Sequence, residues 1–257
     1  MRTLGVIPAR LGSTRLPRKV LLDIAGRPMI EWVWRAAAGS GLMDEVVVAT
    51  DSDEVMTACA ARGIPARMTS AECASGSDRV CEVARQVEAE IYVNIQGDEP
   101  LLMPEHFQPL LGLFERAEVR VGTVAVPCPA EDVENPNAVK VVMARDGRAL
   151  YFSRSTIPFD RDGASGQAGG VAAGEAGRVA NRVAWWKHLG LYAYRREVLE
   201  EFARLRPSAL EMAERLEQLR MLENGMEIYV GLAEGDTIGV DTEADRLRVE
   251  AVLGQRG

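Results

Sequence analysis

Residues 3–19 read Thr-Leu-Gly-Val-Ile-Pro-Ala-Arg-Leu-Gly-Ser-Thr-Arg-Leu-Pro-Arg-Lys, an apolar run followed by a basic loop. The run Thr3–Pro8 is typical of a short buried strand. In the loop, glycine and serine allow a tight turn whose backbone N–H groups can face an anion. A solvated basic loop would have a similar composition. We nevertheless predict a parallel strand whose carboxyl end leads into a polyphosphate-binding loop, because position, composition and charge agree.

Strand-like and helix-like patterns alternate through the rest of the N-terminal half. Glu45–Thr50 and Glu90–Ile95 are β-rich apolar runs, and Gly63-Ile64-Pro65 begins a further extended piece. Helical patterns separate them. We expect helices at Pro28–Ala38, from the cap region Asp51–Asp53 through Arg62, at Asp78–Glu88 and at Pro104–Ala117. This alternation predicts a mainly parallel sheet covered on both faces, an α/β fold.

The C-terminal half is mixed. Strands are predicted at Val119–Val126, Ala138–Met143, Ala149–Phe152, Gly190–Arg195 and Glu227–Val230. Pro207–Asn224 is the longest helical pattern, and a terminal helix is expected to end at Leu253. Residues 162–180 are rich in glycine and alanine and are expected to form a mobile loop. We find no repeat and no linker, which favours a single domain over residues 1–257.

The charge is placed unevenly along the 257 residues. The whole chain has 30 basic and 38 acidic residues, a net charge of −8. Residues 1–22 hold five cations and no acid, which leaves 25 basic against 38 acidic residues, a net of −13, for the rest. An acidic chain with 4 Trp, 5 Tyr and 5 Phe does not favour nucleic-acid or membrane-surface binding. The basic loop therefore points to a small anionic ligand.

Cysteine and histidine counts narrow the chemistry further. The four cysteines show no CxxC spacing, and the N-terminus lacks the apolar stretch of a secretory signal. We therefore expect a reducing, cytoplasmic location. The chain has 2 histidines, so a metal site would have to use carboxylates.

Two aspartates follow apolar runs and are candidate metal ligands. Asp98 lies in Gln96-Gly97-Asp98-Glu99-Pro100, directly after the Glu90–Ile95 strand. A divalent ion on a triphosphate usually takes one or two protein carboxylates, so Asp98 is the first candidate. Asp241 precedes the terminal helix, where an aspartate is more often a helix N-cap than a ligand.

Three other segments are ambiguous as bare sequence. Ser75-Gly76-Ser77-Asp78-Arg79 suits contact with a base or ribose, but it also reads as an ordinary N-cap. His188 stands at a strand start, where a lone histidine is usually structural. Glu217 and Gln218 lie on the polar side of the long helical pattern, which favours a solvated face.

Taken together, these segments resemble one family over essentially the full length. The chain is similar to 3-deoxy-manno-octulosonate (Kdo) cytidylyltransferases, members of the sugar-nucleotidyltransferase superfamily. The matching stretches are Ile7–Arg10, Ser13–Pro17 with Lys19, Ala49–Asp51, Asn94–Pro100, Asn135–Lys140, Tyr151–Arg154 with Ile157-Pro158, His188–Gly190, Leu216–Arg220 and Gly239–Thr242.

The resemblance implies a Rossmann-like nucleotidyltransferase fold of the glycosyltransferase A type with a smaller β-rich part. Approximately residues 1–125 would be the nucleotide-binding half, and 126–257 would carry the sugar-acid site and a homodimer contact. It implies a reaction in which CTP and Kdo give CMP-Kdo and pyrophosphate with Mg²⁺, for lipopolysaccharide biosynthesis.

The resemblance also assigns roles to individual residues. The nucleotide would be bound by Ala9, Arg10, Ser13, Arg15, Lys19, Ser75, Gly76, Ser77 and Arg79. Asp98 and Asp241 would bind the metal, and with Arg10 and Lys19 they would form the catalytic set. Gln96, Arg154, His188, Tyr192, Glu217 and Gln218 would surround the sugar acid.

Two alternatives stay open at this point. The accepted sugar acid could be amino-Kdo or a nonulosonate, since the glycine-rich segment 162–180 flanks the sugar side. A nucleotide-binding regulator without chemistry would keep the basic loop, although retention of both Asp98 and Asp241 weighs against it.

Overall fold

The structure is a computed structural model that describes residues 1–12, 16–73, 75–161 and 184–254. The chain forms two compact units. The first comprises Met1–Gln108, Leu191–Ala203 and Thr237–Gly257, and the second comprises Pro109–Gly190 and Arg204–Asp236. These bounds differ from a division near residue 125, because the chain returns twice to the first unit.

The first unit contains a parallel sheet with β1 at its centre. Its strands β1 (Thr3–Ala9), β4 (Glu45–Thr50), β5 (Ala66–Met68) and β6 (Ile91–Asn94) are ordered β6-β1-β4-β5. Val6 of β1 pairs with Val47 of β4 on one side and with Asn94 of β6 on the other. The later strand β10 (Trp186–Arg195) runs antiparallel to β6. The expectation of a mainly parallel sheet is therefore confirmed.

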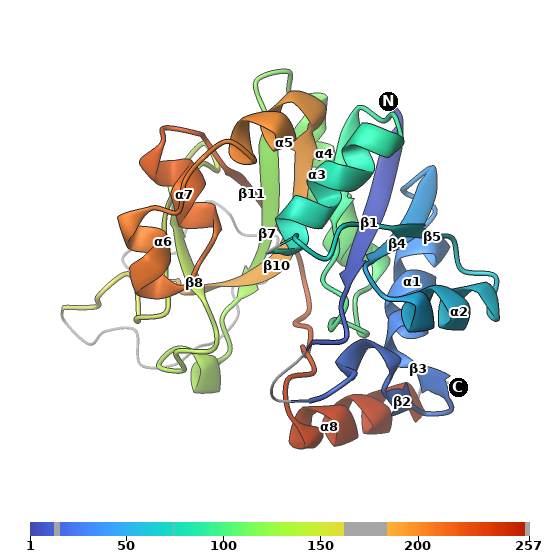
Figure 1. Cartoon of the computed structure of the whole chain (residues 1–257). Helices are drawn as coiled ribbons and strands as arrows, with labels where there is room; N and C mark the ends of the chain where they lie inside the picture. The colour runs from blue at the N-terminus through green and yellow to red at the C-terminus, as the bar shows by residue number, and fades with distance from the viewer. Residues whose placement is uncertain (13–15, 74, 162–183, 255–257) are drawn as a thin grey trace. The chain divides into compact units, whose positions relative to one another are not determined.

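Helices cover this sheet because its strands are apolar on both faces. β1 and β4 are almost entirely buried. In Figure 1, α1 (Met29–Gly39) and α3 (Gly76–Gln86) lie alongside β1, and α1 also contacts β4. Further helices that include first-unit residues are α2 (Asp53–Ala60), α4 (Pro104–Gly112), α5 (Arg196–Phe202) and the terminal helix α8 (Glu243–Gly254). The short helix α5 was not predicted from the sequence.

A second apolar cluster of the first unit lies beneath the end of the basic loop. The 3-10 helix η1 (Lys19–Leu21) leads into the short pair β2 (Asp23–Ile24) and β3 (Arg27–Pro28). The terminal helix α8 (Glu243–Gly254) packs beside β2 (Figure 1). The cluster joins these elements through Ile24, Met29, Leu101, Val240, Val249 and Leu253. The basic loop and the C-terminal segment are thus held to one small core.

The second unit combines parallel and antiparallel strands. β7 (Val121–Pro127) pairs in parallel with β11 (Tyr229–Leu232), while β8 (Lys140–Met143) pairs antiparallel with β9 (Ala149–Ser153) and β10. The remaining elements are η2 (Leu113–Glu115), η3 (Ala130–Asp132), α6 (Ala209–Glu214) and α7 (Gln218–Glu223).

The single helix predicted over Pro207–Asn224 is wrong. The structure forms α6 and α7 instead, separated at Arg215, whose φ is +57°. The guanidinium of Arg154 donates to the carbonyls of Glu214 (2.7 Å) and Arg215 (3.4 Å). Those carbonyls accept from a distant side chain instead of from the next helical turn, which explains the interruption.

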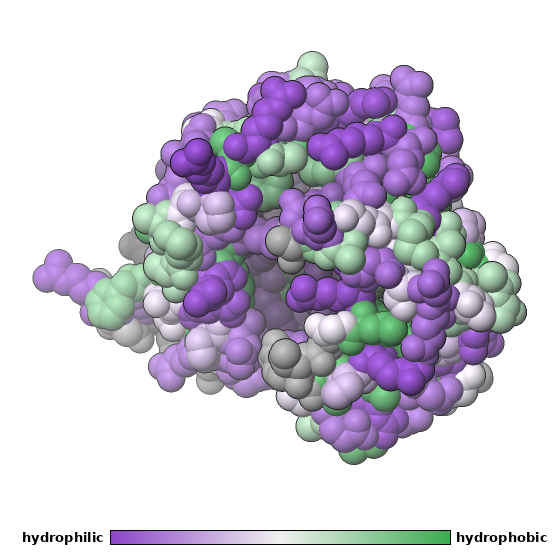
Figure 2. All heavy atoms as spheres, in the orientation of Figure 1, coloured by the Kyte–Doolittle hydropathy of each residue, from purple (hydrophilic) through white to green (hydrophobic). Residues whose placement is uncertain are grey.

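Surface polarity agrees with the composition. On the face drawn in Figure 2, hydrophilic residues predominate and hydrophobic residues form separate small patches. Among the described residues, no helix is both long and apolar enough to cross a membrane. The segment expected to be a mobile loop, residues 162–180, lies outside the described residues.

Candidate active site

Lys19 at the end of the basic loop lies between the two candidate metal ligands. Its Nζ donates to Asp98 Oδ2 at 2.6 Å and to Asp241 Oδ1 at 3.0 Å. The lysine side chain is 14% exposed, against 32% for Asp98 and 46% for Asp241. Three residues separated by up to 222 positions therefore form one partly open charge cluster.

Asp98 reaches this position because the chain passes close to the end of β1. Ile95 N donates to Val6 O at 2.9 Å, which fixes the chain after β6 against β1. Two residues later, a Cβ on Gly97 would lie 2.9 Å from Pro8 O. Only glycine allows that approach, so Asp98 emerges at the carboxyl edge of the parallel sheet.

Asp241 is brought to the same place by a backbone contact. Val240 N donates to Asp98 O at 2.9 Å, and the Val240 side chain is fully buried. The start of α8 is capped by Thr242 and Asp245: the Asp245 N–H donates to Thr242 Oγ1 and the Thr242 N–H donates to Asp245 Oδ2. The cap is thus made by neighbours of Asp241, whose own carboxylate faces Lys19, and the interpretation as a helix N-cap is not supported.

The electrostatics of the cluster suit a cation between two carboxylates. Burial disfavours the charge on Lys19, but the ion pairs with Asp98 and Asp241 outweigh it and raise the pKa of Lys19. No group of three or more metal-binding side chains occurs among the described residues. Two carboxylate oxygen donors beside the basic loop fit Mg²⁺, which usually takes one or two protein carboxylates and keeps water and phosphate oxygens as its other ligands.

The predicted nucleotide-binding segments surround the carboxyl end of β1. Arg10 is exposed directly after β1, and Ala9 is buried within it. A Cβ on Gly76 would meet the Pro8 ring at 3.4 Å, which places the start of α3 against the end of β1. Ser13 and Arg15 lie outside the described residues.

The start of α3 is capped by its own side chains. Ser75 and Asp78 form a capping box, with Asp78 N donating to Ser75 Oγ and Ser75 N donating to Asp78 Oδ2. The box fixes the direction in which the first backbone N–H groups of the helix point, including that of the buried Ser77. Such N–H groups are suited to a base carbonyl or a phosphate.

Arg79 has a different environment from the one the resemblance implied. Its guanidinium is 4% exposed and donates to Thr69 Oγ1 at 2.7 Å and to Asp51 Oδ2 at 2.8 Å. It therefore ties α3 to the residues that follow β4 and β5. Contact of Arg79 with a nucleotide stays a prediction.

The predicted sugar-binding residues belong to both units. Gln96 and Tyr192 are in the first, where Tyr192 is Asn94's partner in the β6–β10 register. Arg154, His188, Glu217 and Gln218 are in the second.

His188 is neutral in the structure. Its Nε2 lies 3.0 Å from Thr123 Oγ1, and its ring packs edge-on against Phe152 with centroids 4.9 Å apart. Burial of the ring lowers the pKa of His188 to about 3. At neutral pH it can orient a hydroxyl through hydrogen bonds, but it is too weak a base to remove a proton from one.

Arg154 is anchored by protein carbonyls. Besides Glu214 and Arg215, its guanidinium donates to Pro136 O at 3.0 Å. Among the described residues, three of its five N–H groups donate to these carbonyls.

Gln218 does not lie on a solvated face, so that interpretation is wrong for this residue, whereas Glu217 is only partly buried. Gln218 is 7% exposed, and its buried Nε2 has no hydrogen-bond partner among the described residues. Glu211 of the same pattern is also buried, where it pairs with Arg220. A buried amide donor without a partner is costly unless a ligand or water accepts from it.

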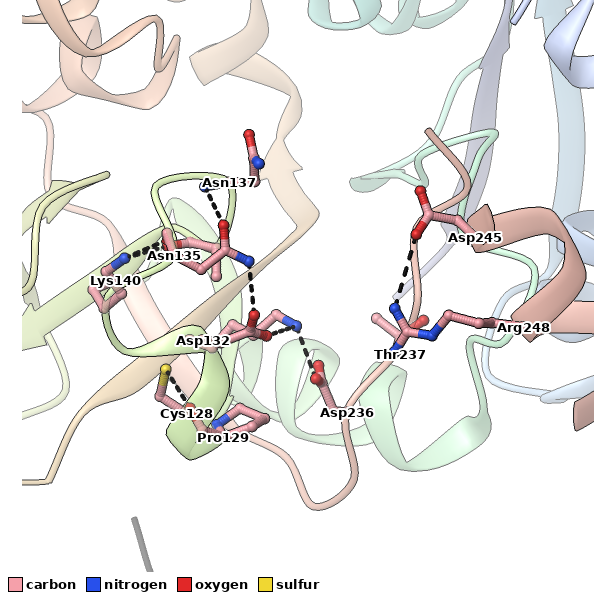
Figure 3. A network of polar contacts seen from close by, with 12 residues as sticks. Cys128, Pro129, Asp132, Asn135, Asn137, Lys140, Asp236, Thr237, Asp245 and Arg248 are labelled. Atoms are coloured by element: carbon pink, nitrogen blue, oxygen red, sulfur yellow. Dashed lines mark hydrogen bonds and ion pairs between the residues drawn. The ribbon is translucent and has the colours of Figure 1, made fainter. Parts of the chain in front are cut away.

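A polar network in the second unit was not predicted from sequence. Lys187 donates to Asp132 Oδ2 and Asp236 Oδ2, both at 2.8 Å, and Asn135 donates to Asp132 Oδ1 at 2.9 Å (Figure 3). Lys140 is fully buried and donates to the carbonyls of Asn135, Ala138 and Arg154. Nothing local in the sequence marks these partners, although a lysine inside an apolar strand pattern is a weak signal.

Comparison with known proteins places this site in a class. Residues 4–228 match the family described as "Cytidylyltransferase". With the parallel sheet, the basic loop and the Lys19–Asp98–Asp241 cluster, this makes the chain a member of the cytidylyltransferases, which are nucleotidyltransferases.

Closer relatives define the family within that class. A 3-deoxy-manno-octulosonate cytidylyltransferase from Acidobacterium capsulatum is 57% identical over 256 residues, covering 100% of this chain and 98% of the relative. A 3-deoxy-manno-octulosonate cytidylyltransferase from Myxococcus xanthus is 48% identical, and the match covers 100% of this chain and 98% of the relative. A solved structure of CMP:2-keto-3-deoxy-manno-octonic acid synthetase complexed with CTP has a TM-score of 0.89 at 40% identity, covering 100% of both chains. The chain belongs to the 3-deoxy-manno-octulosonate cytidylyltransferase family.

Proposed function

We propose that this enzyme transfers CMP from CTP to the anomeric hydroxyl of Kdo, releasing pyrophosphate, with Mg²⁺ as cofactor. The observation that carries the proposal is the placement of Lys19 between Asp98 and Asp241 at the carboxyl edge of the sheet. The names of the relatives, and the CTP bound to the similar structure, support the choice of CTP and Kdo.

The nucleotide would occupy the carboxyl end of β1. Arg10 and Lys19 supply positive charge for the triphosphate, and Ser13 and Arg15 belong to the same loop. The capped start of α3, with Ser75, Gly76 and Ser77, would contact the cytidine.

Asp98 and Asp241 would hold the metal. A bound Mg²⁺ would withdraw charge from the phosphate oxygens and lower the pKa of a coordinated hydroxyl. The protein's part is to present two carboxylates from fixed backbone, beside a lysine that stays charged because its pKa is raised.

The sugar acid would be bound by charged and amide side chains. Arg154 provides a cation for its carboxylate, while Glu217 and Gln218 of the same unit hydrogen-bond its hydroxyls. The unpartnered Gln218 Nε2 supports such a role, because a hydroxyl would satisfy it.

The reaction is a direct displacement at phosphorus. The anomeric oxygen of Kdo forms a bond to the α-phosphorus of CTP while the bond to the pyrophosphate oxygen breaks, and the hydroxyl proton leaves to solvent. Positioning and charge neutralisation supply most of the catalysis, since no covalent enzyme intermediate is needed.

A substrate panel tests the proposal. Pyrophosphate release is measured with CTP or UTP, combined with Kdo, amino-Kdo, a nonulosonate or no sugar. We expect the highest kcat/KM with CTP and Kdo. A higher kcat/KM with another sugar acid would show that this sugar acid, not Kdo, is the substrate. Binding of CTP without pyrophosphate release in the presence of any sugar would indicate a nucleotide-binding regulator.

We also propose a homodimer that works in the cytoplasm and supplies CMP-Kdo for lipopolysaccharide synthesis. Family membership supports this setting. The dimer is tested by light scattering after gel filtration, where a mass near twice the 28.0 kDa of one chain is expected.

A further inference from the structure

The segment Gln96–Pro100 contains an acidic residue that the proposed site does not use. We propose that Glu99 is a positioning residue that holds Thr237–Val240 beside Asp98, and so fixes where the carboxylate of Asp241 is presented. The inference rests on the proposed function, in which Asp98 and Asp241 share a metal ion.

Both carboxylate oxygens of Glu99 face the segment that leads to Asp241. Thr237 Oγ1 donates to Glu99 Oε2 at 2.8 Å, and Thr237 is 4% exposed. A Cβ on Gly239 would lie 3.0 Å from Glu99 Oε1, so the backbone of Gly239 runs close to the same carboxylate. One glutamate thus contacts two positions of a segment that lies about 140 residues later in the chain.

The backbone that follows this segment leads directly to Asp241, one of the two proposed metal ligands. Val240 N donates to Asp98 O at 2.9 Å, and Asp241 is the next residue. The Asp241 side chain is 46% exposed and therefore packs little against its surroundings. On the other side, the Asp241 N–H donates to Asp245 Oδ2 at 3.2 Å. The location of the Asp241 carboxylate therefore depends both on its ion pair with Lys19 and on the backbone that Glu99 and Asp245 hold.

This arrangement predicts an effect on metal affinity. Groups that orient metal ligands typically change metal affinity by about 10- to 100-fold when they are removed. Loss of the Glu99–Thr237 contact would let Asp241 move away from Asp98. More metal would then be needed to reach the same turnover.

The test uses Glu99→Ala and Thr237→Val, with Thr237→Ser as the conservative variant that keeps the hydroxyl. The control is Glu88→Ala, whose side chain is 89% exposed. Half-maximal Mg²⁺ concentration is measured at saturating CTP and Kdo. We expect an increase of about tenfold for Glu99→Ala and Thr237→Val, with kcat at saturating Mg²⁺ within about threefold of wild type. Thr237→Ser and the control should behave as wild type.

A second readout does not depend on turnover. Binding of Mn²⁺ in the presence of CTP, without sugar, is followed by electron paramagnetic resonance, and the same about tenfold weakening is expected. The double variant Glu99→Ala, Thr237→Val should bind Mn²⁺ no more weakly than Glu99→Ala alone, because Thr237 acts through its hydrogen bond to Glu99. If Glu99→Ala does not fold, Thr237→Val alone carries the test.

Unchanged Mn²⁺ binding in Glu99→Ala and Thr237→Val would overturn the inference, as would fully additive effects in the double variant. Wild-type protein that binds Mn²⁺ and CTP but releases no pyrophosphate with any sugar acid would instead overturn the proposed function. The two failures are therefore distinguishable.

Discussion

Lys19 has the environment that most constrains the chemistry of this site. A single ammonium group holds two carboxylates that would otherwise repel each other across the same small space. The ion pairs raise the pKa of Lys19 despite the burial of its side chain, so the lysine keeps its charge throughout the neutral range. It can therefore serve as the fixed positive charge next to a triphosphate.

Replacing Lys19 by methionine should lower kcat/KM by about 100-fold or more, because a preorganised positive charge near the reacting phosphate is lost. The matched control is Arg18→Met. Arg18 is the neighbouring cation, and it is exposed and paired with Glu54. We expect the control to stay within about threefold of wild type in initial rates of pyrophosphate release. An equal loss of kcat/KM in Lys19→Met and Arg18→Met would show that only the net positive charge of the loop matters, not the position of Lys19.

His188 gives a second residue-scale prediction, for stability against pH. Its pKa is about 3 in the folded chain and about 6.5 when unfolded. As pH falls below 6.5 the unfolded chain takes up a proton that the folded chain refuses, so stability is lost. By pH 5 the loss reaches up to about 2 kcal/mol.

The His188→Gln variant should lack this component. Urea unfolding at pH 7 and pH 5 measures it, with all other groups titrating alike in both proteins. An equal loss of stability in wild type and His188→Gln between these pH values would contradict a neutral, buried imidazole.

At the residue scale, prediction from sequence depended on local context. The location of Asp98 could be predicted, because a carboxylate just after a buried strand must lie at the edge of the sheet. The hydrogen bond of Glu99 could not be predicted, because its partner Thr237 is 138 residues away and lies in no recognisable sequence motif. The burial of Lys140 could not be predicted from the sequence either, because its hydrogen-bond acceptors are backbone carbonyls, which every residue has.

At the scale of elements, periodicity was reliable where local contacts decide the structure. The strand predicted at Glu45–Thr50 is β4 with the same bounds. Prediction from periodicity failed over Pro207–Asn224. The apolar spacing is continuous there, but the guanidinium of Arg154 donates hydrogen bonds to the carbonyls at the end of α6. A tertiary hydrogen bond cannot be read from the spacing of apolar residues in the segment that it interrupts.

Two glycines allow a matched test of how β-strand ends position the site. A Cβ on Gly97 would lie 2.9 Å from Pro8 O, and one on Gly231 would lie 2.7 Å from Pro109 O. Both Gly97→Ala and Gly231→Ala should therefore lower the free energy of unfolding, by about 1–3 kcal/mol. Gly97→Ala should in addition reduce kcat/KM at least tenfold, since Asp98 is the next residue.

Thermal unfolding and initial rates, measured below the melting temperature of both variants, separate the two effects. If Gly97→Ala and Gly231→Ala lose stability alike but keep equal activity, Gly97 has no role in placing Asp98.

At the scale of the whole molecule, the net charge of −8 is the result of two opposed distributions. The basic loop gathers cations after β1, and the acidic remainder contributes the two carboxylates that Lys19 joins. The α/β class could be predicted from alternating patterns. The interleaving of the two units could not, because it depends on which distant strands pair, as β10 does with β6.

We propose that Asp98, Asp241 and Lys19 form the centre at which CMP passes from CTP to Kdo. The most direct test of this proposal is phosphorus NMR of a reaction containing CTP, Kdo and Mg²⁺, run with wild type, with Asp98→Asn and with wild type plus EDTA. We predict that wild type converts CTP into CMP-Kdo and pyrophosphate in equal amounts. Asp98→Asn should lose at least about 1000-fold in rate while retaining its fold, and chelation should stop the reaction. Formation of CMP-Kdo by Asp98→Asn at a rate near that of wild type would contradict the proposal.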